Sequence, residues 1–225
     1  MTEINPAERL SIPRLIAAPA VITLGVTILR LVGELEHWSR TWFNPEAGGP
    51  WSVVGITWLP PVFGVYFALR LARAGEGPKS IGRAVGLVLL AVVVICGLSY
   101  LGGALHVERS FQGRLLYFWA IIVIAALITL RGWPKLFKTM LAYGYLAHIP
   151  VAALMFFAFQ GDWHTHYDAL PPDMPAGAGL WFRYLWLGFV PQLIFWVGFT
   201  IVAGMLFGTL GLALTRLLRR NAHAV

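Results

Sequence analysis

The chain alternates between long apolar runs and short polar segments, and the apolar runs are long enough to cross a membrane. They lie at about residues 15–35, 51–69, 84–105, 115–130, 136–159 and 192–214. A helix of about 20 apolar residues spans the hydrocarbon core of a bilayer. The pattern therefore predicts an all-α fold, a polytopic helical membrane bundle with about six transmembrane helices, forming a single transmembrane domain over residues 1–225.

Prolines interrupt two of the predicted spans in a way that bears on function. Pro60-Pro61 lie within the second run and predict a kink or break near its middle, because proline removes a backbone donor and clashes with the preceding turn. The last apolar run starts at Leu180, and Pro191 is expected to divide it into an interfacial aromatic piece and the true span. The fifth run contains Pro150, and the interrupted second and fifth runs favour a substrate site, because interrupted helices often line such sites in membrane transporters.

The polar segments between the runs differ in charge on the two sides of the predicted membrane. One set of alternate loops and ends holds 12 basic residues, and the other set holds five. Basic residues concentrate in cytoplasmic loops, so the first set is predicted to be cytoplasmic, with both termini. The 12 are Arg9, Arg14, Arg70, Arg73, Lys79, Arg83, Arg131, Lys135, Lys138, Arg216, Arg219 and Arg220. We expect an integral membrane protein, of a bacterial inner membrane, with most acidic residues and histidines on the outer side.

Composition narrows the possible functions. Hydrophobic residues make up 58% of the chain and charged residues 12%, about half of the roughly 25% usual in soluble proteins. No large soluble domain fits between the spans. The net charge of +7 follows from the basic loops that face an anionic leaflet, so nucleic acid is not an expected partner. The single cysteine, Cys96, excludes an intrachain disulfide and cysteine-based zinc binding.

The outer polar loop, residues 160–179, contains the strongest candidate for a chemical site. Asp162, His164, His166 and Asp168 would share a face in an extended strand, and in a helix they would pair at i,i+4. Imidazole and carboxylate groups together suit zinc or another divalent transition metal. The alternatives are a solvated loop without a ligand, and a proton-sensing or substrate-contacting segment.

Three further candidates lie inside the apolar runs. His148, about halfway along the fifth run, is expected to face the bundle interior or a wet cavity, either as a cofactor contact or as a neutral histidine bonded to a neighbouring helix. Arg30 and Glu34 stand at i,i+4, as a helical ion pair or with Arg30 as an anion-binding group in an outer cavity. Gln192, beside Pro191, can hydrogen-bond a ligand or another helix.

Aromatic and small residues suggest contacts of other kinds. Trp163 and Trp181 belong to a large group of aromatic residues on the outer side, which an aromatic belt at the membrane–water interface explains. They could instead sandwich a lipid-like or aromatic ligand in one pocket. The GxxxG motif Gly204–Gly208 lets another helix approach closely, within the chain by default or in a homo-oligomer or membrane-protein partner.

The sequence leaves three functions open, and whether the protein is an enzyme stays uncertain. The leading hypothesis is a protein that binds or transports a small molecule or lipid through an outer-facing cavity, alone or as a subunit of a complex. The second is a membrane-embedded metal-dependent enzyme that uses the outer His/Asp site. The third is a structural accessory subunit. No HExxH, GxSxG or GxGxxG motif is present to favour a particular chemistry.

Overall fold

The computed structural model describes residues 11–47, 52–107 and 110–222, and within these ranges every regular element is a helix. Five are long α-helices: α1 (Ile12–Leu35), α3 (Ile81–Ala104), α4 (Phe111–Leu130), α5 (Pro134–Gly161) and α7 (Val197–Ala222). Shorter elements are the 3₁₀ turn η2 (Ile56–Trp58), α2 (Leu59–Arg73), α6 (Leu180–Arg183), and the π-helical segments η4 (Tyr184–Phe189) and η5 (Gln192–Trp196). The predicted fold class, an all-α membrane helical bundle, is confirmed.

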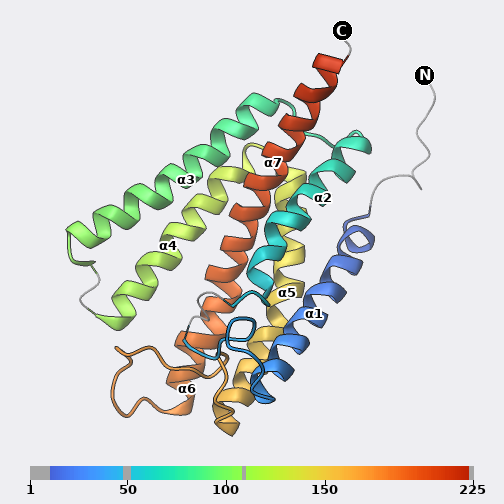
Figure 1. Cartoon of the computed structure of the whole chain (residues 1–225). Coiled ribbons are helices and arrows are strands. Elements are labelled where there is room, and N and C mark those ends of the chain that lie inside the picture. The colour runs from blue at the N-terminus through green and yellow to red at the C-terminus, as the bar shows by residue number, and fades with distance from the viewer. Residues whose placement is uncertain (1–10, 48–51, 108–109, 223–225) are drawn as a thin grey trace.

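Successive helices cross the bundle in alternating directions (Figure 1). Helix α7 is central and packs against α2, α3, α4 and α5. Helices α3 and α4 form a hairpin on one flank, and α1 lies against α5 on the other. The beginning of α1 and the end of α7 lie at the same end of the bundle (Figure 1). This end is called the basic end below, and the opposite one the cavity end.

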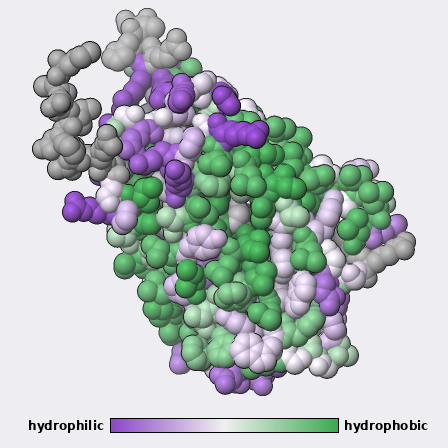
Figure 2. Space-filling view, turned by 180° about the vertical axis from the view of Figure 1, so that it is seen from behind, coloured by the Kyte–Doolittle hydropathy of each residue, from purple (hydrophilic) through white to green (hydrophobic). Residues whose placement is uncertain are grey.

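The described helices confirm that the chain can span a membrane. Five helical stretches are long and apolar enough, at Ile12–Leu35, Ile81–Ala104, Phe111–Leu130, Pro134–Gly161 and Leu180–Arg219. Between the polar ends, the surface is a broad apolar band (Figure 2). These features fit an integral membrane protein.

The second predicted span, 51–69, is corrected by the structure. Residue 51 lies outside the described part of the chain, and α2 begins at Leu59 and continues to Arg73. Pro60 and Pro61 therefore occupy the first turn of α2, where proline costs little because the first backbone donors have no helical partner. With 15 residues, α2 is about 22 Å long, short of the roughly 30 Å hydrocarbon core. Residues 52–58, which precede α2, are not α-helical.

The last predicted span, 192–214, is longer than expected, because the helix runs without interruption from Leu180 to Ala222. Pro191 does not separate an interfacial piece from a span. It lies between the π-helical segments η4 and η5, whose wider turns accommodate a residue that cannot donate a backbone hydrogen bond. The same wide turns bring the side chains of this stretch to the cavity described below.

Glycines let α2 and α7 pack in direct backbone contact. A Cβ atom added to Gly64 would overlap the backbone of Gly204, and one added to Gly208 would approach the carbonyl oxygen of Gly64 at 2.5 Å. The Gly204–Gly208 motif is thus used within the chain. A homo-oligomer or membrane partner at this motif stays a prediction.

The basic loops meet at one end of the bundle. Lys135, at the start of α5, lies 3.0 Å from Glu76 in the loop after α2, and the indole of Trp133 donates to the Glu76 carbonyl oxygen at 2.9 Å. The guanidinium of Arg216, near the end of α7, lies beside Gly77. Three segments that were predicted to share a side of the membrane therefore lie together, and their cytoplasmic location stays a prediction.

Candidate functional site

A cavity of about 540 Å³ extends from the loops at the cavity end into the bundle. This volume lies within the range of about 300–1,000 Å³ usual for small-molecule pockets. Ile56, Thr57 and Pro60 line it, so the late start of α2 leaves room where a full-length helix would stand. Its walls are rich in aromatic rings: Phe118, Trp119, Trp186, Phe195, Trp196 and Phe199.

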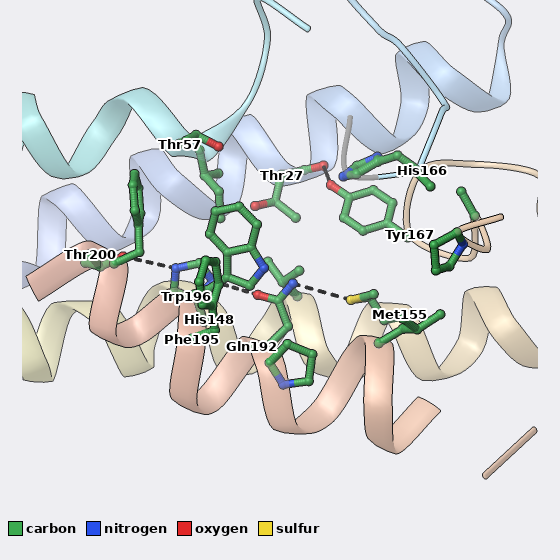
Figure 3. A pocket seen from close by; sticks show the side chains of 18 of the residues that line it. Thr27, Thr57, His148, Met155, His166, Tyr167, Gln192, Phe195, Trp196 and Thr200 are labelled. Atoms are coloured by element: carbon green, nitrogen blue, oxygen red, sulfur yellow. Dashed lines mark hydrogen bonds between the residues drawn. The ribbon is translucent and has the colours of Figure 1, made fainter. Parts of the chain in front are cut away.

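The inner part of the cavity contains a buried polar cluster (Figure 3). Nδ1 of His148 on α5 lies 2.8 Å from Oε1 of Gln192, and Nε2 lies 3.2 Å from Oγ1 of Thr200. The Gln192 amide donates to Sδ of Met155 at 3.4 Å. His148, Gln192 and Thr200 are all buried, with His148 4% exposed. Their mutual hydrogen bonds therefore take the place of hydrogen bonds to water.

Their partners define the tautomer of His148. The Gln192 carbonyl oxygen is an acceptor, so Nδ1 of His148 carries the hydrogen. Nε2 is then the acceptor, and the hydroxyl of Thr200 donates to it. The imidazole ring is stacked beside Trp196, with centroids 6.3 Å apart and planes inclined by 20°. His148 thus contacts two side chains of the neighbouring helical stretch 180–222, and both interpretations given by the sequence stay predictions.

A second polar cluster lies near the cavity entrance. Nε of Arg30 donates to Glu34 at 2.8 Å, one turn further along α1. The same carboxylate accepts from the backbone N–H of His166 at 2.9 Å and lies 2.7 Å from its Nδ1. The Arg30 guanidinium also donates to the carbonyl oxygen of Asn44 at 3.2 Å. The predicted ion pair of Arg30 and Glu34 thus also anchors the outer loop.

Residues 164–168 of the outer loop form a compact turn, and residues just after this turn line the cavity. The Asp168 carboxylate accepts from the backbone N–H groups of His164 and Thr165, at 2.9 and 2.8 Å, and from the Thr165 hydroxyl at 2.8 Å. The Tyr167 hydroxyl donates to the carbonyl oxygen of Thr27 on α1 at 3.2 Å (Figure 3). Ala169, Pro171 and Pro172 follow and line the cavity.

The environment of His166 determines its charge. Burial holds the pKa of His166 below its ordinary value of about 6.5, and the positive Arg30 acts in the same direction. The hydrogen bond to Glu34 and the nearby Asp168 oppose this shift but do not outweigh burial. His166 is therefore neutral at neutral pH, with the Nδ1 hydrogen donated to Glu34. Burial likewise raises the pKa of Tyr167, which keeps its hydroxyl hydrogen.

Of the four residues predicted to bind metal, His164 is exposed, and the other three are engaged in different interactions. His166 is paired with Glu34, and Asp168 caps the turn. Asp162 is 73% exposed and lies 4.0 Å from Arg183. Across the part of the chain that the structure describes, no three His, Cys, Asp or Glu side chains are grouped so that they could hold a metal ion. The metal hypothesis receives no support from this arrangement.

The other predicted residues divide between the cavity and the surface. Four of them line the cavity: Arg30, His148, His166 and Gln192. Glu34 does not line it, but it accepts a hydrogen bond from Arg30. Trp163 and Trp181 do not line it. Trp163 packs over Gly161 in a cluster with Tyr167, and Trp181 is 64% exposed, so the two do not meet in this cavity.

Several cavity residues were not singled out from the sequence. Trp196 and Thr200 follow Gln192 at intervals of four residues, so a shared helix face was readable. Thr27 and Trp119 carried no such signal, because a threonine or a tryptophan within an apolar run is ordinary in a membrane helix.

Comparison with family models, curated proteins and solved structures finds no match to this chain.

Proposed function

We propose that this protein binds a small, largely apolar molecule in the cavity. The aromatic side chains would pack against the apolar part of the ligand, and the polar clusters would bind its functional groups. The observation that carries this proposal is the cavity of about 540 Å³, lined by six phenylalanine and tryptophan rings and by Tyr167, with His148, Gln192 and Arg30 among its polar groups. Natural ligand pockets have this composition: apolar walls and a small number of fixed polar groups.

The helix irregularities support the same proposal. The cavity lies between the late start of α2 and the π-helical segments around Pro191. Single π-helical turns are retained frequently at functional sites, where they redirect side chains. Neither irregularity is needed for a helix whose role is only to cross the bilayer, so a purely structural subunit would explain them less well.

A cavity-filling substitution tests the proposal. Val151 on α5 lines the cavity and is 4% exposed, whereas Val93 on α3 is 64% exposed. The probe is radiolabelled 2-acetylnaphthalene, and its binding to the protein in lipid nanodiscs is measured by equilibrium dialysis, with empty nanodiscs to subtract partition into lipid. Val151→Trp is expected to abolish saturable binding, and Val93→Trp to leave it unchanged.

Two results would contradict the proposal. One is a wild-type protein that binds no more probe than empty nanodiscs, and the other is equal binding by the wild type and both variants. Because a tryptophan at 151 could disturb folding, Ala169→Trp, on the loop side of the cavity, provides a second blocked variant. Size-exclusion chromatography shows that each variant is intact before binding is measured.

A further inference from the structure

The Gln192 side chain has a fixed orientation. Its carbonyl oxygen accepts the Nδ1 hydrogen of His148 at 2.8 Å, and its amide nitrogen faces Sδ of Met155 at 3.4 Å. The reversed amide would place the carbonyl oxygen against the thioether, and these are both acceptors. His148 and Met155 therefore hold the amide so that its N–H₂ group remains the available side (Figure 3).

The amide of Gln192 has donor capacity to spare. Its nitrogen carries two hydrogens, and one meets a thioether, which is a weak acceptor. The second has no partner among the described residues. Since Gln192 lines the cavity, an acceptor on a ligand bound there would satisfy this donor.

The two ring nitrogens of His148 are already in use. Nδ1 donates to Gln192, and Nε2 accepts from Thr200. His148 is thus a positioning residue that turns the amide, and it has no free lone pair for a ligand or a metal ion. The inner cluster offers a ligand a spare amide donor.

Charges near the cavity select against an ionic ligand. The inner cluster holds no charged group, and the Arg30 guanidinium at the entrance is compensated by Glu34 at 2.8 Å. An anion or cation placed beside Gln192 would lose its hydration without meeting an opposite charge, which is expensive in an apolar interior. A neutral acceptor such as a carbonyl oxygen has a much lower desolvation cost.

The shape of the walls favours a flat molecule. Trp196 lies against His148 in a stacked arrangement, and Trp119 and Trp186 stack with centroids 5.6 Å apart and planes inclined by 22°. Aromatic faces pack well against a planar ring. Phe195 and Phe199 also line the cavity and meet Trp196 edge to face, with ring planes inclined by 83° and 79°.

We infer that the cavity selects an uncharged, planar molecule that places a carbonyl oxygen at the amide of Gln192, as an aromatic ketone or a quinone would. This inference rests on the proposed function, since it specifies the ligand class of the same cavity.

Three naphthalene probes of closely similar size separate the effect of a neutral carbonyl group from the effects of ring packing and of negative charge. 2-Acetylnaphthalene carries a neutral carbonyl acceptor, 2-isopropenylnaphthalene replaces the carbonyl oxygen with a CH₂ group, and 2-naphthoate carries an anion. Each is measured in nanodiscs against empty nanodiscs. Because a net hydrogen bond contributes about 1 kcal/mol, the ketone is expected to bind about fivefold more tightly than the hydrocarbon. Naphthoate is expected to bind more weakly than the ketone.

Variants assign this preference to Gln192. Gln192→Met removes both amide hydrogens at similar length, and His148→Phe in the same chain removes the Nδ1 hydrogen that would otherwise be left free to bind the ketone. In this double variant the ketone and the hydrocarbon should bind equally, and its hydrocarbon affinity shows that the cavity is intact. Met155→Leu removes the competing thioether at similar volume, while His148 still fixes the carbonyl oxygen of the amide, so the preference for the ketone should persist or grow.

The outcomes distinguish this inference from the proposed function. If the wild type binds ketone and hydrocarbon equally, or binds naphthoate best, the inference fails and the proposed function stands. If the preference for the ketone survives in the double variant Gln192→Met with His148→Phe, the assignment to Gln192 fails. Should none of the probes bind saturably, both proposals are overturned. If the double variant does not fold, loss of the preference in Met155→Leu would overturn the inference.

Discussion

Nδ1 of His166 lies 2.7 Å from the carboxylate of Glu34, although the two residues are 132 positions apart in the chain. Glu34 also accepts a hydrogen bond from Arg30, so one carboxylate joins the outer loop to the guanidinium at the cavity entrance. A single carboxylate thus compensates a buried cation and fastens the outer loop to α1. This double role makes Glu34 the residue of the entrance whose loss should have the largest effect.

Glu34→Ala is expected to destabilise the protein by about 3–5 kcal/mol, because removing one partner of a buried ion pair leaves the other uncompensated. The side chains of Arg30 and Glu34 are 10% and 0% exposed. The measurement is reversible SDS unfolding in mixed micelles. Asp173→Asn is the matched control, since Asp173 pairs with Arg114 at 44% and 30% exposure, and pairs of this kind contribute at most about 1 kcal/mol. Equal losses in both variants would show that Glu34 has no special role.

The closed outer loop is expected to open in acid. The pKa of His166 is lowered by burial in the closed loop and returns to about 6.5 when the loop opens. Above about pH 6.5, His166 is neutral in both the open and the closed loop. Below it, His166 is protonated first in the open loop, so the closed loop is lost as the pH falls from about 6.5 toward the lowered pKa. The charges that face His166 are Arg30 and Glu34 on α1 and Asp168 within the loop.

Hydrogen exchange of residues 165–172, corrected for the intrinsic pH dependence of exchange, measures this opening. Between pH 7.5 and 5.5, opening should increase by up to about tenfold per pH unit below 6.5. His166→Asn keeps an N–H donor for Glu34 and does not titrate, so its loop should respond much less. An identical pH response in the variant would assign the effect to another group.

The sequence predicts most of this fold because four of the spans are bounded by polar loops, and the apolar pattern alone defines them. Residues 51–58 are apolar as well, so they resemble the start of a helix. In the structure, Gly55 is extended and the Ser52 hydroxyl donates to the carbonyl oxygen of Trp42 at 2.7 Å. Such contacts between distant segments, and not the local pattern, determine where α2 begins.

The sequence also predicted part of the cavity lining, but not the contacts between its side chains. Arg30, His148 and Gln192 stand out because polar groups are costly within apolar runs, and all three line the cavity. The sequence could not show that His166 meets Glu34 instead of a metal ion, or that Thr200 meets His148. These pairs come from different helices and loops, and their distances depend on how the bundle packs.

Two glycine substitutions test the close packing of α2 and α7. Gly64→Ala places a methyl group within the backbone of Gly204 and should cost about 1–3 kcal/mol, or more if the helices cannot separate. Gly97→Ala, on α3, meets no atom within 4 Å and should be neutral or stabilising by up to about 1 kcal/mol. SDS unfolding of both variants provides the comparison. A neutral Gly64→Ala would mean that the two helices are not in backbone contact.

The orientation of the bundle determines whether the cavity opens outside the cell. We expect the cavity end to face outward, because the loops of the basic end carry most of the lysine and arginine residues. The test uses a Cys96→Ser background with single cysteines at positions 46 and 164, near the cavity end, and at 79 and 219, near the basic end. An impermeant maleimide is applied to intact and permeabilised cells.

Positions 46 and 164 should react in intact cells, and positions 79 and 219 should react only after permeabilisation. The pair 46 and 79 is the decisive one, because it reports whether the short α2 carries the chain across the membrane. If 46 and 79 react from the same side, the chain has no crossing at α2, and the count of six fails. If 79 and 219 react from outside while 46 and 164 do not, the bundle is inverted, and the cavity draws its ligand from the cytoplasm.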